Sequence, residues 1–136
     1  MANTNQSSRR ILLADDEPLV VRVMTRMLVE NGYQVVAAKD GREAFRILQS
    51  DAEFRAAFFD LQMPHLMGID LIRYMRTEKR LIRIPVILMT GDQSLSAQVE
   101  SFAAGAMAFL MKPITNQNMQ TILRLLGAKE GAVCES

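Results

Sequence analysis

Acidic, hydroxyl and basic side chains follow directly after four apolar runs of this 136-residue chain. In chain order they are Asp15, Asp16, Asp60, Thr90 and Lys112. Carboxylates that converge in a partly buried pocket repel one another, and their burial is costly unless a cation is present. Carboxylates with a few waters suit Mg²⁺, which usually takes one or two protein carboxylates. We therefore expect a magnesium site with Asp16 and Asp60 as direct ligands and Asp15 acting through water.

A carboxylate at such a site can also act as a nucleophile towards phosphorus and form an aspartyl phosphate. In such a reaction the protein contributes mainly by placing charged groups around the phosphoryl group. The metal and a cation such as Lys112 can neutralise the phosphoryl oxygens, and the Thr90 hydroxyl can donate a hydrogen bond to one of them.

The side chains that carry this chemistry need a sheet to hold them together. Apolar runs that are continuous instead of alternating are typical of strands buried on both faces, as in a parallel sheet. A fifth run, rich in Val and Ala, lies between the first two. In chain order the predicted strands are Ile11–Ala14, Tyr33–Ala38, Ala56–Phe59, Val86–Met89 and Met107–Met111.

Helical patterns alternate with the strands, and spacings of three and four place one apolar stripe on each helix. We expect these stripes to face the core. They are Leu19, Val23, Met27; Ala44, Ile47, Leu48; Ile69, Ile72, Met75; Leu95, Val99, Phe102, Ala103; and Met119, Ile122, Leu125, Leu126.

Turn and capping residues agree with these helices. Gly32, Gly105 and Gly127 follow the first, fourth and fifth helices, where a left-handed residue often ends a helix. Asp40 and Glu43 have the spacing of a capping box for the second helix. The element order is therefore a βα unit repeated five times, with helices on both faces of the sheet. In such folds the ligand site lies at the carboxyl ends of the strands.

Composition predicts one globular domain over residues 9–127, with polar or small-residue tails at 1–8 and 128–136. The net charge of +1 without a basic run argues against direct nucleic-acid binding. No segment has the length of a membrane span, and the polar N-terminus is unlike a signal peptide. Because Cys134 is the single cysteine, no internal disulfide can form, which fits a reducing, cytoplasmic setting.

Four motifs in order carry a resemblance to a known family: DDE, FFDLQMP, LMTG and FLMKP. Asp60 follows Asp16 by 44 positions, Thr90 follows Asp60 by 30, and Lys112 follows Thr90 by 22. Together the motifs and spacings resemble response-regulator receiver domains over about residues 9–127. The resemblance implies a three-layer, doubly wound, flavodoxin-like α/β fold whose five parallel strands have the order 2-1-3-4-5.

The resemblance also implies roles in phosphoryl transfer. Asp60 would be the phosphoacceptor, supplied by a sensor histidine kinase or a histidine phosphotransfer protein, and Lys112 would bind the phosphoryl group. The backbone carbonyl of Gln62 would be the third protein ligand of Mg²⁺, and the bond from Lys112 to Pro113 is expected to be cis. Gln62 and Asp92 would tune how fast the phosphoryl group is gained and lost.

A switch is implied as well. Thr90 would move towards the phosphoryl group, and Phe109 would turn inward into the vacated space. A surface made by the fourth helix, fifth strand and fifth helix would then engage a downstream protein or a second copy of the chain as a homodimer. Catalysis would be limited to the protein's own phosphorylation and dephosphorylation.

The sequence is also compatible with other functions. The chain could be a docking protein that is recognised regardless of phosphorylation, or the receiver part of a longer regulator with an output domain. An aspartyl-phosphate phosphatase would need a second acid two residues after Asp60, where Gln62 stands. A dinucleotide-binding fold would need a glycine-rich turn after the first strand, where DDEPLV stands. We expect the only histidine, His65, to be a polar loop residue.

Overall fold

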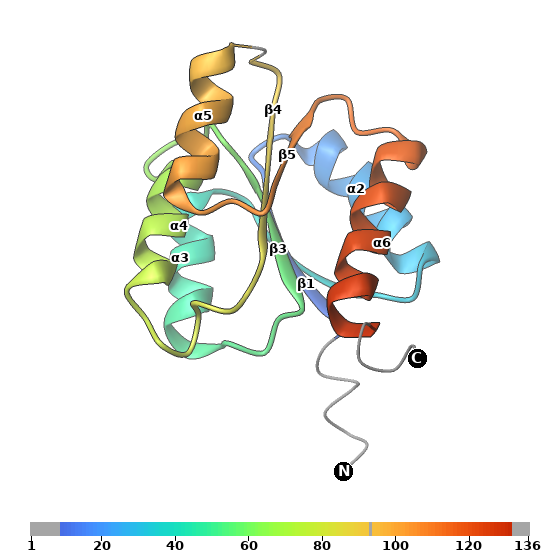
Figure 1. The fold of residues 1–136 in the computed structure, drawn as a ribbon, viewed down its shortest axis with the longest axis horizontal. Coiled ribbons are helices and arrows are strands. Elements are labelled where there is room, and N and C mark those ends of the chain that lie inside the picture. The colour runs from blue at the N-terminus through green and yellow to red at the C-terminus, as the bar shows by residue number, and fades with distance from the viewer. Residues whose placement is uncertain (1–8, 93, 132–136) are drawn as a thin grey trace.

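The computed structural model describes residues 9–92 and 94–131, with side chains up to residue 127. It contains five strands and five helices in strict alternation (Figure 1). In chain order they are β1 (Arg10–Ala14), α2 (Pro18–Glu30), β2 (Gln34–Ala38), α3 (Gly41–Ser50), β3 (Ala56–Asp60), α4 (Gly68–Arg76), β4 (Val86–Thr90), α5 (Leu95–Ala104), β5 (Ala108–Met111) and α6 (Asn116–Gly131).

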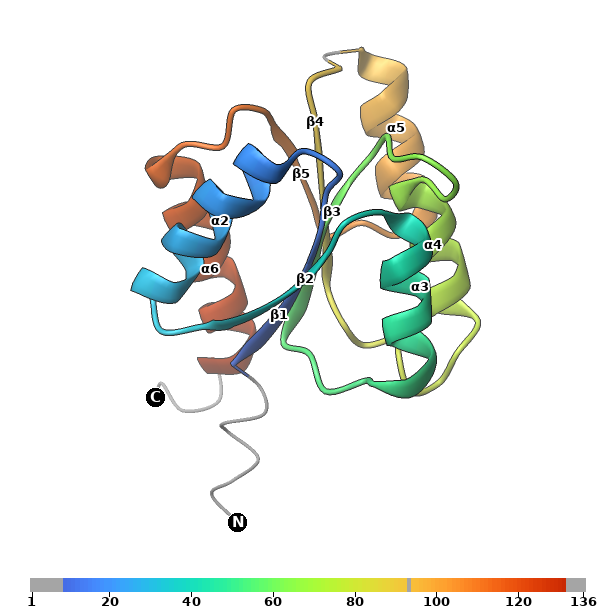
Figure 2. The same ribbon diagram turned by 180° about the vertical axis from the view of Figure 1, so that it is seen from behind.

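All five strands pair in parallel in the order β2-β1-β3-β4-β5, which confirms the predicted sheet. Helices α2 and α6 cover one face, and α3, α4 and α5 cover the other (Figures 1 and 2). Side chains alternate along each strand. Ile11 and Leu13 therefore belong to the core under α2 and α6, whereas Leu12 and Ala14 belong to the opposite core.

For two helices, α2 and α5, the sequence analysis predicted the wrong side to face the core. In α2, Leu19 is 68% exposed, while Met24 and Leu28 are buried. Both sides of this helix carry apolar residues, so spacing alone did not reveal which side meets the sheet.

Helix α5 packs through small residues instead of the large ones. Ala97, Ser101 and Ala104 are buried, whereas Leu95 is 72% exposed. Small side chains let the helix lie close to its neighbours, and the larger apolar residues point outward. Val99 and Phe102 are also exposed, as is Ala103.

The other stripes face the core as predicted, apart from exposed Leu125 in α6 and partly buried Ile47 in α3. Gly32 and Gly105 have φ of 89° and 120°, as expected after a helix. Gly127 does not end its helix, because α6 continues to Gly131.

Asp40 caps the N-terminus of α3 as predicted, but the reciprocal hydrogen bond of a capping box is shifted by one residue. Asp40 Oδ1 accepts from the Glu43 amide at 2.9 Å, but the Glu43 carboxylate accepts from the amide of Lys39 instead of that of Asp40. The predicted tail at 1–8 and the cysteine at 134 lie outside the described residues. Within the described part, no helix is long and apolar enough to cross a membrane.

Candidate functional site

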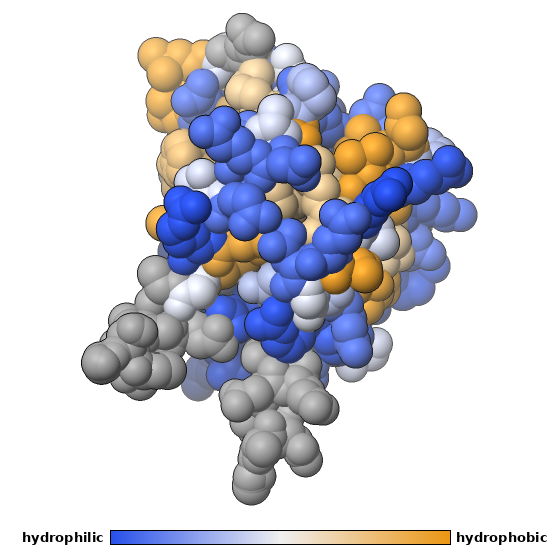
Figure 3. Space-filling view, turned by 90° about the vertical axis from the view of Figure 1, so that its right-hand side faces the viewer, coloured by the Kyte–Doolittle hydropathy of each residue, from blue (hydrophilic) through white to orange (hydrophobic). Residues whose placement is uncertain are grey.

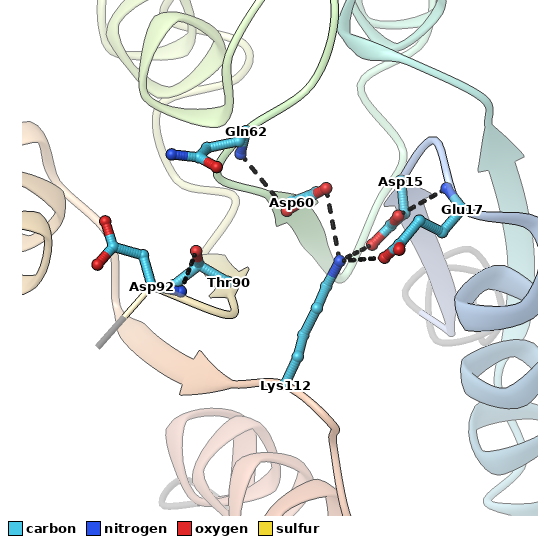
Figure 4. Close-up of polar contacts among 7 residues, drawn as sticks. All are labelled: Asp15, Glu17, Asp60, Gln62, Thr90, Asp92 and Lys112. Atoms are coloured by element: carbon cyan, nitrogen blue, oxygen red, sulfur yellow. Dashed lines mark hydrogen bonds and ion pairs between the residues drawn. The ribbon is translucent and has the colours of Figure 1, made fainter. Parts of the chain in front are cut away.

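The carboxyl ends of four strands bring the predicted site residues together (Figure 4). Asp60 and Thr90 are the last residues of β3 and β4, while Asp15 and Lys112 come directly after β1 and β5. Because β1 pairs with β3, and β4 with both β3 and β5, these strand ends are neighbours. The strand order thus places an acidic pair, a hydroxyl and a lysine at one edge.

Three carboxylates form a cluster that suits a cation. Asp15, Asp16 and Asp60 each offer one oxygen, and these oxygens lie within 4.8 Å of one another. Asp15 is 1% exposed and Asp60 is 6% exposed, whereas Asp16 is open to solvent. Two nearly buried carboxylates beside a third carry unbalanced negative charge, which a hard divalent ion would neutralise.

One buried oxygen of this cluster has a single partner among the described residues. Asp15 Oδ1 accepts from the Glu17 amide at 2.9 Å, whereas the only partner of Asp15 Oδ2 among the described residues is the Lys112 ammonium. Lys112 Nζ lies 2.8 Å from this oxygen as an ion pair. A buried carboxylate oxygen with spare capacity is a natural acceptor for a water molecule of a hydrated Mg²⁺ ion. The donor set therefore fits the expected metal.

Lys112 is shared by three carboxylates. Its Nζ lies 2.8 Å from Asp15 Oδ2, 3.0 Å from Glu17 Oε1 and 3.5 Å from Asp60 Oδ2. Burial disfavours the charged amine, but the contacts with Asp15 and Glu17 outweigh it, so the pKa of Lys112 lies above its usual value. The lysine is therefore a permanent cation in the pocket.

The Asp60 carboxyl lies in an environment that disfavours its charged form. Burial, and then the charge of Asp15, raise the pKa of Asp60 to about 6, and Lys112 opposes that rise only in part. Asp60 Oδ1 accepts from the Gln62 amide at 3.4 Å, which is a weak hydrogen bond. Asp60 is thus a carboxylate whose negative charge the protein alone does not fully balance.

Thr90 lies on the other side of the pocket. Its side chain is buried, and its hydroxyl oxygen accepts from the Asp92 amide at 3.0 Å. Asp92 Oδ1 in turn accepts from the amide of Ser94, the N-cap residue of α5. The hydroxyl is therefore connected to the start of α5 through two successive hydrogen bonds.

A pocket of about 660 Å³ opens at this edge of the sheet. Its polar side carries Asp60, Thr90 and Lys112, and its apolar side is formed by α2 and the segment after β5. The apolar lining residues are Leu19, Val20, Val23, Met24, Pro113 and Ile114. Figure 3, which faces the side covered by α2 and α6, shows hydrophobic side chains exposed among polar ones.

Two predicted residues lie at the margin of this arrangement. Phe109 in β5 is half-buried and is not a lining residue of the pocket; its ring packs against Phe102 of α5, with centroids 6.4 Å apart. Asp92 also lies outside the lining, with its carboxylate engaged by Ser94. The Lys112–Pro113 bond is cis, as expected.

Glu17 also contacts the site, although the sequence pattern assigned this residue no functional role. It is the N-cap residue of α2, yet its side chain makes no capping hydrogen bond and reaches Lys112 instead. The only available signal was its place in the DDE triplet.

A doubly wound parallel sheet that carries carboxylates, a hydroxyl and a lysine at its carboxyl edge is suited to binding a cation and a phosphoryl group. Residues 11–124 match the response regulator receiver domain family. The chain therefore belongs to this family, whose members accept a phosphoryl group and signal through it.

Relatives with this domain differ in length. The response regulator MprA of Mycolicibacterium vanbaalenii is 35% identical over 117 residues, which is 86% of this chain but 49% of MprA. The chemotaxis protein CheY1 of Helicobacter pylori is 28% identical over 118 residues, and the match covers 95% of CheY1. The chain thus spans about half of MprA and nearly all of CheY1.

Solved structures agree with the fold. The receiver domain of sensor histidine kinase PA1611 from Pseudomonas aeruginosa is 30% identical, with a TM-score of 0.79 and coverage of 88% of this chain and 98% of that one. It has a magnesium ion coordinated in its active-site cleft. Chemotaxis protein CheY4 of Vibrio cholerae is 26% identical, with a TM-score of 0.80 and the same coverage of both chains.

Proposed function

We propose that Asp60 is the phosphoacceptor of this receiver domain and that the reaction requires Mg²⁺. The observation that carries the proposal is the convergence on Asp60: two further carboxylates within 4.8 Å and the Lys112 ammonium at 3.5 Å. The domain itself would comprise residues 9–127.

The residues that would hold the ion are Asp16, Asp60 and the carbonyl of Gln62, with Asp15 acting through a water molecule. The spare acceptor capacity of buried Asp15 Oδ2, whose only described partner is Lys112, supports this assignment. When bound, Mg²⁺ supplies positive charge to the phosphoryl oxygens and relieves the repulsion among the carboxylates. The magnesium ion in the PA1611 receiver domain lies in its active-site cleft, which also supports the metal.

The chain's own groups then have separate tasks. An Asp60 oxygen attacks the phosphorus of a phosphohistidine on the donor, a new P–O bond forms, and the P–N bond breaks with its electron pair passing to the imidazole nitrogen. Lys112 neutralises one phosphoryl oxygen, for which it must shift from Asp15 and Glu17 towards the transferred group. The Thr90 hydroxyl donates to another oxygen.

The signal would pass from the pocket to the face formed by α5, β5 and α6. When the Thr90 hydroxyl turns to the phosphoryl group, its hydrogen bond from Asp92 breaks, and Phe109 moves inward. Leu95, Val99 and Phe102 stand exposed on α5 and offer apolar contacts for a downstream protein or a second copy of the chain.

The donor would be a sensor histidine kinase or a phosphotransfer protein, and the setting would be cytoplasmic. Gln62 and Asp92 would tune the rates at which the aspartyl phosphate forms and hydrolyses. The protein would catalyse these two steps on itself alone.

Beryllofluoride, which mimics a phosphoryl group, tests the proposal. With Mg²⁺ present, ¹H–¹⁵N spectra of the wild-type protein should show shifts around Asp60, Thr90 and Lys112, and Asp60→Asn should show none. Unchanged wild-type spectra, or equal changes in Asp60→Asn, would refute the acceptor role.

A further inference from the structure

The loop between β3 and α4, residues 61–67, carries the carbonyl of Gln62 that the metal would use. Gln62 is exposed, and among the described residues its backbone amide makes only the long 3.4 Å hydrogen bond to Asp60. Little at Gln62 itself therefore fixes the direction of its carbonyl. The contacts that fix this loop lie further along it, towards α3 and α4.

The first residue of α3 presses directly on the backbone of this loop. A Cβ atom at Gly41 would overlap the carbonyl oxygen of Leu66 and lie 2.8 Å from its carbonyl carbon. Backbone cannot yield as the end of a flexible side chain can, so any side chain at Gly41 must displace Leu66 or α3. Figures 1 and 2 both show α3 and α4 side by side, with the loop at the top of this layer.

The centre of the loop is a tight turn. The Leu66 amide donates to the Pro64 carbonyl at 2.8 Å, and His65 between them has φ of 73°. A three-residue turn with such a central residue is rare and strained, so surrounding contacts must hold it. One contact is Arg42 of α3, whose Nη2 lies 3.0 Å from His65 Nδ1. Because a guanidinium only donates, His65 Nδ1 is the acceptor.

The end of the loop touches the acceptor residue. The Gly68 amide donates to the Leu61 carbonyl at 3.0 Å, and a Cβ atom at Gly68 would lie 2.7 Å from the carbonyl oxygen of Asp60. The loop is therefore closed on itself at one side of Gln62 and pressed by α3 at the other. Its backbone has little freedom while both contacts persist.

We propose that Gly41 and Arg42, at the start of α3, are positioning residues of the metal site. Gly41 fixes the distance between α3 and the loop, and Arg42 holds the strained turn at His65. Together they orient the Gln62 carbonyl towards the ion. This inference rests on the proposed magnesium site and names residues outside the pocket on which its affinity depends.

Two matched glycine substitutions test the first part. Gly41→Ala should weaken Mg²⁺ binding about tenfold, as is typical when groups that orient metal ligands are lost. Gly127→Ala is the control, because a Cβ atom there meets nothing within 4 Å, and it should bind Mg²⁺ as the wild type does. Calorimetric titration with MgCl₂ gives the affinities, and the Gln62 amide resonance reports the loop.

Arg42 provides a test that does not depend on how well Gly41→Ala folds, since its side chain is exposed. Arg42→Met should weaken Mg²⁺ binding roughly threefold, as loss of one hydrogen bond allows, and Arg42→Lys, which keeps charge and a donor, should lose less. Simple electrostatics predicts the opposite sign, because removing a cation near an anionic site favours Mg²⁺. The sign of the change therefore separates positioning from charge.

These titrations distinguish failure of the positioning role from failure of the magnesium site itself. Wild-type affinity in folded Gly41→Ala, or tighter binding in Arg42→Met, overturns the positioning role and leaves the magnesium site intact. Weaker binding in both, with a shifted Gln62 resonance and an unchanged Gly127→Ala, supports it. A wild-type protein whose titration with Mg²⁺ shows no binding overturns the metal site and this inference together.

Discussion

The two edges of the sheet hold carboxylates and cations in opposite ways. At the amino edge, Arg10 meets Asp51 through two parallel hydrogen bonds of 3.1 and 2.9 Å. At the carboxyl edge, Lys112 is divided among Asp15, Glu17 and Asp60. The hydrogen bond from Arg10 lowers the pKa of Asp51, whereas burial raises that of Asp60.

The difference separates a structural ion pair from a reactive site. A planar guanidinium and one carboxylate match in geometry and charge, so the Arg10–Asp51 pair is complete. One ammonium carries a single positive charge and cannot neutralise three carboxylates, so the carboxyl edge keeps negative charge that a metal ion can balance.

Removal of the shared cation should have the largest effect on stability. Lys112→Met leaves the carboxylates of the site facing one another, and we expect unfolding free energy to fall by about 3 kcal/mol at pH 8. Urea denaturation without Mg²⁺ measures the loss, and MgCl₂ should restore part of it. A variant as stable as the wild type would mean that Lys112 does not balance this cluster.

Removal of the Asp60 charge should instead stabilise the protein. Asp60 has a higher pKa folded, about 6, than its ordinary 3.8. The folded state therefore binds more protons, and stability falls as pH rises from about 4 to 6. Without Mg²⁺, Asp60→Asn should be about 1–2 kcal/mol more stable than the wild type at pH 8, and equal to it at pH 3. A difference that does not change with pH would contradict the raised pKa.

Removal of the Asp51 charge at the amino edge should instead destabilise the protein, because Arg10 stabilises that charge. The pKa of Asp51 is lowered in the folded protein, so its contribution is present above the unfolded pKa and is lost as pH falls through the folded one. Asp51→Asn should cost about 1 kcal/mol at pH 7 and much less in acid, by urea denaturation. Phosphorylation of Asp60 should be unchanged, since Asp51 lies at the far edge.

The smallest effect is expected at Glu17. Its side chain is 61% exposed, and exposed ion pairs contribute little. Glu17→Gln should change the unfolding free energy by less than about 0.5 kcal/mol, because Asp15 still holds Lys112 at 2.8 Å. A loss comparable to that of Lys112→Met would show that Glu17, and not the buried carboxylates, holds the lysine.

The sequence was sufficient to predict the edge that carries the chemistry. The continuous apolar runs predicted a parallel sheet, and a parallel sheet brings strand ends together wherever they lie in the chain. The strand order itself came from the resemblance. Asp16, Asp60, Thr90 and Lys112 could therefore be placed at one edge before any contact was known.

Contacts between distant residues were harder to predict. The side of α2 that meets the sheet was missed, because Leu19 lies on an apolar stripe but stands in the wall of the pocket. The turn at His65 was missed for another reason: its left-handed backbone depends on contacts with α3, which local sequence does not encode. Tertiary packing decided both features.

Phosphoryl transfer from a small-molecule donor tests whether Asp60 is the acceptor. The wild-type protein, incubated with acetyl phosphate and MgCl₂, should gain the mass of one phosphoryl group, and Asp60→Asn and EDTA-treated wild type should gain none. The modified peptide should contain Asp60. A phosphoryl group elsewhere, or equal labelling of Asp60→Asn, would contradict the assignment of Asp60 as the acceptor.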